Sequence, residues 1–539
     1  MTTPPPSPPR SGVPAWLALV VVAAVYAGAP MAGFVWDDQS LYLGNHAVSV
    51  PSWEKIWMRD LWCCSGGAAS GYYRPLITLS FVLDRSLFGL SSVGPHLHSL
   101  AWHLLVVHLT RLLLLERVGP ARAWTAALIF GLHPIQSEAV LFLSARSELV
   151  MAAGVVGTLL AVDRRRLPLA ACVALLACLA KETAYLLVLV VPLWQYAWGG
   201  RWSRRAQLWI VAGLLVALLL RSRAELGDAA VAAVAQLNPL SALYAVVRTT
   251  SWWLVPWPLS ATWILSDQPP SITTWLSALA GGGLALFLVL RGGPRPLALL
   301  AISAILLAPS ALAVWGYGLV GERYLYVGML GVVATIVAEL PRPRADWVFA
   351  GWLVPWVAGA LGIIFVRAPD WASTQSLFRS AVERAPSGVS WNHYAGALMG
   401  DGEDAAALHA FEQSLAGTQP SLVPCRHVVE VAERLLDDDD FRRRTGAWRE
   451  LGCGGGPIFD GSLALAYVRR GWWQEAAVLL ENRESQPNRQ PDDARRVEVV
   501  AALFSARDGD LLGYGAIWLD WPRRRLALLD VVAGVLQAR

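Results

Sequence analysis

The sequence predicts an all-α polytopic membrane protein with a second helical domain after its last membrane span. Of the 539 residues, 55% are hydrophobic and only 16% are charged, and the mean hydropathy is +0.45. Apolar runs recur along the first part of the chain, and many of the 27 Trp residues lie near the ends of those runs. This composition is typical of membrane proteins and excludes an ordinary soluble enzyme.

The chain begins with a segment rich in Pro and Ser, residues 1–13, which predicts a disordered cytoplasmic tail. The first apolar run, at roughly 14–33, continues into Trp36-Asp37-Asp38 without a small-residue cleavage site. We therefore expect this run to remain as a membrane anchor.

Ten further apolar runs follow, separated by basic clusters. Some of the runs are shorter than the roughly 20 residues of a straight span. If all the basic clusters face the cytoplasm, the positive-inside rule gives about eleven crossings within a membrane domain at 14–368. The runs lie near 97–116, 121–132, 147–162, 167–180, 183–199, 206–220, 275–290, 296–315, 320–340 and 346–366, and the clusters at Arg10, Arg117/Arg122, Arg164–Arg166, Arg201/Arg204/Arg205, Arg291/Arg295 and Arg342/Arg344.

One further apolar segment, 238–263, does not fit this count because it carries Arg248 and two prolines. A full span here would move Arg291 and Arg295 to the outer side. We interpret the segment as interfacial or re-entrant.

The remaining polar motifs then lie on the outer face of the membrane. Paired carboxylates such as Asp37 and Asp38 are costly at a bilayer edge and indicate a functional site, although they could also cap a solvated helix. A carboxylate can take a proton, and Arg or Lys can stabilise a phosphate leaving group, so the convergence of both signs predicts a one-sided active site. The other motifs are Tyr73-Arg74-Pro75-Leu76, Leu132-His133-Pro134 with Glu138, Arg146 with Glu148, Lys181-Glu182 and Gly321-Glu322-Arg323-Tyr324.

The order of these motifs resembles that of a known enzyme family. Trp-Asp-Asp, Tyr-Arg-Pro-Leu, Leu-His-Pro-x-x-x-Glu-x-Val, Arg-x-Glu, Lys-Glu-Thr and Glu-Arg-Tyr-Leu-Tyr are similar to motifs of the GT-C glycosyltransferases. The similarity is greatest to the transmembrane and tetratricopeptide-repeat (TMTC-like) O-mannosyltransferases and their bacterial relatives, over about residues 14–400. It implies an inverting transfer of a sugar, such as mannose, from a polyprenyl-phosphate donor to a protein or glycan acceptor on the outer face.

The resemblance also implies residue roles. The acid of the first outer loop would be the base, which makes Asp37 the catalytic choice and Asp38 the second candidate. Arg323 would bind phosphate, or else anchor the interface. His96 and His103 match a His-x6-His pattern in which Ser99 replaces the usual Asn; they could instead be polar packing residues. The candidates for the donor phosphate are Arg74, Arg146, Lys181 and Arg323, and those for the sugar or acceptor are His133, Glu138, Glu148, Glu182, Glu322, Tyr324, His96 and His103.

After about Arg367 the chain loses its long apolar runs, and helical stretches near 403–415, 422–436, 460–470, 473–482, 494–506 and 522–537 predict an extracytoplasmic, tetratricopeptide-like domain at 369–539. Asp437–Asp440 followed by three arginines predicts a solvated loop and helix start rather than a metal site. Disulfides could form within Cys63-Cys64 and between Cys425 and Cys453 in an oxidising compartment, whereas Cys172 and Cys178 are expected in the core.

These observations predict a multi-pass protein of the inner (plasma) membrane, with its active site and C-terminal domain outside the cytoplasm. Its partners would be a polyprenyl-phosphate sugar, a protein or glycan acceptor and membrane lipid. No cofactor, metal site or nucleic acid is expected, because the cysteines lack metal spacing, no phosphate loop follows a strand and the arginines lie between spans. The alternatives are a lipid-linked glycan polymerase or ligase of the same fold, and a non-catalytic membrane scaffold that recruits partners through its repeat domain.

Overall fold

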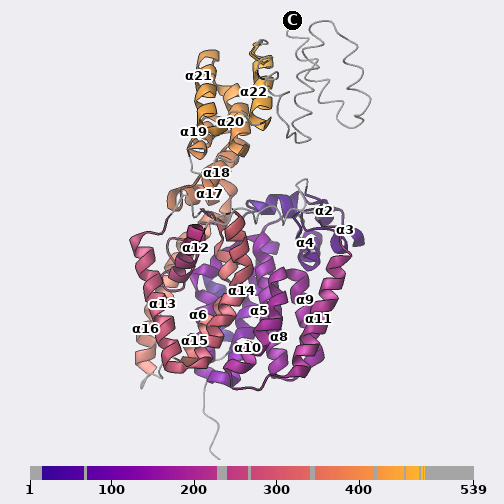
Figure 1. Cartoon of the computed structure of the whole chain (residues 1–539), viewed down its shortest axis with the longest axis vertical. Helices are drawn as coiled ribbons and strands as arrows, with labels where there is room; N and C mark the ends of the chain where they lie inside the picture. The colour runs from indigo at the N-terminus through magenta and orange to yellow at the C-terminus, as the bar shows by residue number, and fades with distance from the viewer. Residues whose placement is uncertain are drawn as a thin grey trace, which may run out of the picture. The chain divides into compact units, whose positions relative to one another are not determined.

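The structure is a computed structural model that describes residues 15–65, 70–226, 239–264, 269–317, 319–339, 346–416, 422–453 and 457–472, with Glu475, Ala476 and Leu479. It is almost wholly helical and divides into two compact units, Met1–Ala385 and Pro386–Arg539 (Figure 1). The predicted domain boundary at 368/369 stays a prediction. The tail 1–13 and the helical stretches 494–506 and 522–537 lie outside the described residues, as does most of 473–482.

Each of the eleven apolar runs overlaps a helix of the first unit. These helices run side by side in a bundle (Figure 1). They are α1 (Ala15–Val25), α5 (Val93–Val118), α6 (Pro120–Leu132), α8 (Arg146–Asp163), α9 (Leu167–Ala180), α10 (Leu187–Ala197), α11 (Arg204–Ser222), α13 (Ile272–Gly292), α14 (Pro294–Tyr317), α15 (Met329–Glu339) and α16 (Asp346–Arg367).

Among the described residues, four helices are long and apolar enough to cross a membrane, and several others are apolar but shorter. The long ones lie at Val93–Val118, Leu143–Asp163, Arg204–Ser222 and Ile272–Gly292, and the shorter ones at Trp16–Met31, Leu167–Ala180, Pro294–Pro309 and Met329–Glu339. A membrane location follows from these helices. The count of about eleven crossings stays a prediction.

Further elements connect these helices, and the labelled α2, α3, α12 and α17 lie at one end of the bundle (Figure 1). The connecting elements are η1 (Ala29–Met31), η2 (Gln39–Leu43), α2 (His46–Ser49), α3 (Trp53–Trp57), α4 (Pro75–Phe88), η3 (Pro134–Gln136), α7 (Ser137–Leu141), η4 (Leu143–Ala145), η5 (Glu182–Leu186), α12 (Pro239–Trp252), β1 (Trp263–Ile264), β2 (Leu319–Val320), η8 (Glu322–Leu325), η9 (Ala368–Ala372) and α17 (Thr374–Arg384).

The described part of the segment 238–263 begins with α12, and a non-helical stretch leads from α12 to β1. β1 pairs antiparallel with β2, with Trp263 opposite Val320 and Ile264 opposite Leu319. Because β2 directly precedes Gly321, the end of this segment lies beside the polar residues of η8.

The second unit packs successive helices around a core of its own. This core includes Phe411, Phe441, Trp448 and Leu463. The acidic run begins a helix, because the side chain of Asp437 accepts a hydrogen bond from the backbone N–H of Asp440 (2.9 Å) at the N-terminus of α21. A tetratricopeptide-type repeat stays a prediction. The helices are α18 (Gly388–Gly400), α19 (Asp404–Leu415), α20 (Leu422–Leu435), α21 (Asp438–Trp448), η10 (Arg449–Cys453) and α22 (Pro457–Arg469).

A disulfide joins Cys425 of α20 to Cys453, and both residues are buried. Cys63 and Cys64 are free thiols. Cys178 is buried as expected, but the prediction of a core position for Cys172 is wrong, because Cys172 lies on an outward-facing side of α9 and is exposed.

We expect the Cys425→Ser/Cys453→Ser variant to lower the free energy of unfolding of the second unit by about 3 to 4 kcal/mol, because the bond closes a loop of 28 residues in the unfolded chain. Hydrogen exchange of the α20 and α22 amides in the full chain would measure the change. Cys172→Ser is the control, and exchange that matches this control would contradict the expectation.

Candidate active site

A polar cavity of about 260 Å³ lies in the first unit. Segments far apart in the sequence form its wall. They include the loop after α1, the chain just before α4, residues 142–148 and 181–183, and η8, together with Leu61, Trp62 and Pro309 of α14. Asp37, Arg74, Glu148, Lys181, Glu182, Arg323 and Tyr324, which sequence analysis singled out, all line this cavity.

Backbone contacts and backbone conformation fix the loop that carries Asp37. The N–H of Gly33 donates a hydrogen bond to the carbonyl of Trp371 (2.9 Å), and a Cβ at Gly33 would collide with the carbonyl oxygen of Ala372. Trp36 has a left-handed backbone (φ 50°), which is uncommon for a residue with a side chain, and its ring stacks on Phe142. This local geometry places the partly exposed Asp37 in the cavity wall.

The neighbouring Asp38 is fully buried and does not line the cavity. Its carboxylate accepts hydrogen bonds from the backbone N–H of Val35 (3.2 Å) and of Ser144 (2.7 Å), and from the Ser144 hydroxyl. Asp38 therefore ties the first loop to residues 142–148. The two adjacent acids have different environments, and Asp37 is the one that a substrate in the cavity can reach.

Two cations of the cavity are paired with acids and lie over aromatic rings. Arg74 donates to one carboxylate oxygen of Glu182 through Nε (3.1 Å) and Nη2 (2.9 Å), and its guanidinium lies over the Tyr72 ring. Lys181 pairs with Glu148, and Lys181 Nζ lies 5.1 Å from the centre of the Tyr324 ring. These contacts hold both cations in the cavity wall.

Arg323 is the third cation. Its guanidinium pairs with Glu138, whose other oxygen accepts the Arg323 backbone N–H (2.8 Å). Nη2 also donates to the Tyr324 hydroxyl (3.3 Å), and the guanidinium lies among the rings of Trp36, Phe142 and Tyr324. Glu138 is fully buried, so it supports Arg323 from behind the cavity wall.

Asp37 differs from the other cavity acids of the described chain, because it has neither an ion pair nor a hydrogen bond. Burial raises the pKa of Asp37 to about 6; Arg323 lowers it and Glu138 raises it further. A carboxyl group with this pKa is ionised near neutral pH and is basic enough to take a proton.

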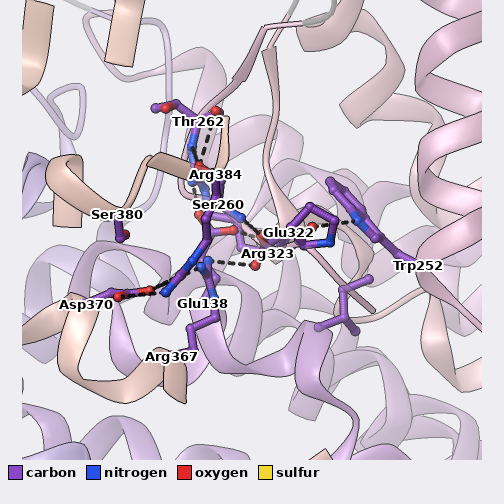
Figure 2. Close-up of polar contacts among 12 residues, drawn as sticks. Glu138, Trp252, Ser260, Thr262, Glu322, Arg323, Arg367, Asp370, Ser380 and Arg384 are labelled. Carbon is purple, nitrogen blue, oxygen red and sulfur yellow. Dashed lines mark hydrogen bonds and ion pairs between the residues drawn. The ribbon is translucent and has the colours of Figure 1, made fainter. Parts of the chain in front are cut away.

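A chain of buried ion pairs lies next to Arg323, as Figure 2 shows. Glu322 accepts hydrogen bonds from the backbone N–H of Ser260 and from Arg367 Nη2 (2.8 Å). Arg367 also faces Asp370 (Nη1 to Oδ2, 3.7 Å), and Asp370 pairs with Arg384 of α17. Glu322 is fully buried and does not line the cavity, so it fixes η8 to the end of α16.

Arg146, a predicted phosphate ligand, lies in the bundle interior and does not line the cavity. It pairs with Asp84 of α4 (2.5 Å) and donates to the hydroxyls of Ser99 (3.1 Å) and Ser80 (3.2 Å) and to the carbonyl of Pro95 (2.6 Å). Arg146 belongs to α8 and its side chain contacts α4 and α5, so it links these three helices. No sequence motif marks Asp84 as its partner.

The three predicted histidines are also buried away from the cavity. His103 Nδ1 lies 2.7 Å from the Tyr326 hydroxyl, and its Nε2 lies 3.1 Å from the Gly131 carbonyl oxygen. His96 and His133 bond to backbone groups near them in the chain. These contacts pack the three histidines inside the bundle, and their role toward the sugar or acceptor stays a prediction.

Several cavity residues were missed by sequence reasoning. Tyr72 could have been found, because it adjoins the Tyr73-Arg74 motif, and Ser144 because it lies two residues before Arg146. Thr183 belongs to the Lys-Glu-Thr motif, and the others carry no motif of their own. The residues missed are Leu41, Leu61, Trp62, Tyr72, Phe142, Ser144, Ala145, Ser147, Thr183 and Pro309.

Comparison with known proteins shows a resemblance to TMTC-type protein O-mannosyl-transferases. The chain is 34% identical over 142 residues to protein O-mannosyl-transferase TMTC3 of Mus musculus, which is 25% of this chain and 15% of that protein. It is 31% identical over 176 residues to protein O-mannosyl-transferase Tmtc1 of Drosophila melanogaster, which is 30% of this chain and 20% of that protein. The chain thus spans a fifth or less of these relatives. No model of a protein family and no solved structure matches.

Proposed function

We propose that this protein is a membrane glycosyltransferase that transfers a sugar from a polyprenyl-phosphate donor to a protein or glycan acceptor on the extracytoplasmic side of the membrane. The observation that carries the proposal is a cavity in which the unpaired acid Asp37 shares the wall with Arg74, Lys181 and Arg323. The similarity to proteins named O-mannosyl-transferases supports sugar transfer, with mannose as the first sugar to test.

The arrangement suits a single displacement at the anomeric carbon. Asp37 takes the proton of the acceptor hydroxyl while the acceptor oxygen bonds to the anomeric carbon. The bond between that carbon and the phosphate oxygen breaks, and its electron pair leaves with the polyprenyl phosphate. Arg323, Arg74 and Lys181 stabilise the negative charge of this leaving group.

Each of these cations already holds a carboxylate partner, and this favours arginine for the phosphate. A guanidinium has five N–H donors in a planar fork. Arg323 directs Nη1 to Glu138 and Nη2 to Tyr324, which leaves donors for a phosphate oxygen. The carboxylate partners fix the cations in place, so little side-chain entropy is lost when phosphate binds.

The direct test supplies purified protein with a panel of polyprenyl-phosphate sugars and measures release of the lipid phosphate in the presence of a protein acceptor. Release of lipid phosphate that occurs with one donor sugar and requires the protein acceptor supports the proposal. Release only with a lipid-linked glycan acceptor would instead indicate a polymerase or ligase. If the protein binds a partner protein without needing a donor and releases no lipid phosphate from any donor, it is the membrane scaffold.

Arg323→Lys is expected to raise the KM for the donor on the order of tenfold while leaving the KM for the acceptor nearly unchanged, because an ammonium group cannot reproduce the fork geometry. Initial rates at limiting donor would measure this. Arg117→Lys is a matched control, because Arg117 pairs with Asp163 away from the cavity. If Arg323→Lys and Arg323→Gln both keep full activity at limiting donor, Arg323 is an interfacial anchor and the phosphate belongs to Arg74 or Lys181.

Placing the second unit outside the cytoplasm is supported by its disulfide, since such bonds persist in oxidising compartments. A reporter fused after Arg367 should be active only outside the cytoplasm, and one fused after Arg166 only inside. A pair of enzyme reporters active on opposite sides would measure this in inner-membrane preparations. Activity of both fusions on the same side would refute the crossing count and the extracytoplasmic site.

A further inference from the structure

A second and larger hollow lies in the first unit, separate from the polar cavity. It is a groove of about 590 Å³ between α4, α5, α8 and α9, and it shares no lining residue with the cavity. Its wall is almost wholly apolar along its length. The side chains include Leu83, Leu105, Leu169, Leu176 and Val173.

The groove opens on the outside of the helix bundle and not into its interior. Leu83, Leu105, Leu169 and Leu176 are each exposed to between 40% and 49%. A surface of this kind on a membrane helix bundle faces lipid, so a hydrocarbon chain is the matching occupant. Small residues such as Ala153 and Gly157 line the groove on α8, where larger side chains would fill the space.

One end of the groove is strongly basic. Arg164 and Arg166, in the turn between α8 and α9, both line it and both are exposed. Their side chains form no ion pair or hydrogen bond within the described chain, whereas the nearby Arg117 pairs with Asp163. Arg165 between them has a left-handed backbone (φ 56°) and does not line the groove. Two unpaired guanidinium groups at the end of an apolar groove match the phosphate of a lipid.

Arg164 and Arg166 lie too far from the polar cavity to bind the phosphate of a sugar donor placed there. Glu148, in the first turn of α8, lines the polar cavity, whereas Arg164 directly follows the last residue of the helix. At 1.5 Å per residue, these two positions lie roughly 25 Å apart. A phosphate held at Arg164 therefore cannot also be the phosphate in the cavity.

We propose that this groove binds an anionic phospholipid, with an acyl chain along the apolar wall and the phosphate at Arg164 and Arg166. The lining residues from Val150 to Arg164 extend over roughly 20 Å of helix, which accommodates one acyl chain. This site depends on the membrane location of the helices and not on sugar transfer.

Native mass spectrometry of the full chain, purified and mixed with phosphatidylglycerol or phosphatidylcholine of the same acyl chains, tests the site. The wild type should retain phosphatidylglycerol preferentially. Arg164→Gln/Arg166→Gln should reduce that retention on the order of tenfold, to the level of phosphatidylcholine, since each arginine contributes attraction to an anionic headgroup. Arg204→Gln/Arg205→Gln is the matched control, because these exposed arginines lie outside the groove.

Gly157→Leu should weaken retention of both lipids, because the added side chain occupies the groove while both arginines remain. Equal retention of the two lipids by the wild type, or equal loss in the control and the Arg164/Arg166 variant, would overturn the proposal. Displacement of bound phosphatidylglycerol by an equimolar polyprenyl phosphate would also overturn it and would assign the groove to the carrier lipid. None of these measurements requires turnover, so they are independent of the proposed activity.

Discussion

Asp37→Asn is expected to lower turnover on the order of a hundredfold or more while expression stays normal, because the amide keeps the size of the side chain but cannot take a proton. Steady-state release of lipid phosphate would measure the loss. Because burial raises the pKa of Asp37 to about 6, wild-type kcat/KM should rise with pH through about 6, as the acid becomes the basic carboxylate, and then level off. That rise should be absent from the residual activity of the variant.

Asp38→Asn separates the two acids. Asp38 accepts hydrogen bonds from Val35 and Ser144, so this substitution should destabilise the first loop and lower the thermal unfolding temperature, unlike Asp37→Asn. Full transfer by Asp37→Asn, with a large loss only in a stably folded Asp38→Asn, would move the base to Asp38. Indistinguishable behaviour of Asp37→Asn and wild type in every assay would favour the scaffold.

Arg367→Gln is expected to destabilise the first unit by about 3 to 5 kcal/mol, because it leaves the fully buried Glu322 without its cation. Thermal unfolding in lipid nanodiscs would measure the loss, with the accessibility of the buried thiol of Cys178 as the readout. We also expect weaker binding of the donor, because Arg367 holds Glu322, and Glu322 directly precedes Arg323 in η8.

The double variant Glu322→Gln/Arg367→Gln is the matched control. It removes both charges but retains an acceptor for the backbone N–H of Ser260, so it should recover much of the stability lost in Arg367→Gln. If Arg367→Gln is as stable as wild type, or if the double variant is no more stable than Arg367→Gln, Glu322 and Arg367 are not coupled as the structure indicates.

The positions of the helices could be predicted from sequence because hydrophobic runs are a local property of the chain. Each of the eleven apolar runs overlaps a helix, and Pro75 after Arg74 begins α4 as expected of proline at a helix start. Boundaries were less predictable: the run at 320–340 includes η8, whose polar residues face other elements, and the helix α15 begins only at Met329.

The candidate site was only partly predictable. Motif order suggested the positions of Asp37, Arg74, Lys181 and Arg323, and the structure brings these residues to one cavity. It places Arg146, with an equally persuasive motif, inside the bundle, because Asp84 supplies a buried partner. A motif records residue type and spacing, but the direction of a side chain depends on the elements packed against it.

The sequence by itself determined the all-α membrane character, the order of the helices and the residue types available for chemistry. Only the tertiary structure decided that Asp37 faces the cavity while Asp38 is bonded to Ser144, 106 residues away, and that Glu322 meets Arg367, 45 residues away. The physical reason is range. Hydrophobic periodicity acts between neighbours in the chain, whereas hydrogen bonds and ion pairs require contact within about 3 to 4 Å, which packing alone arranges.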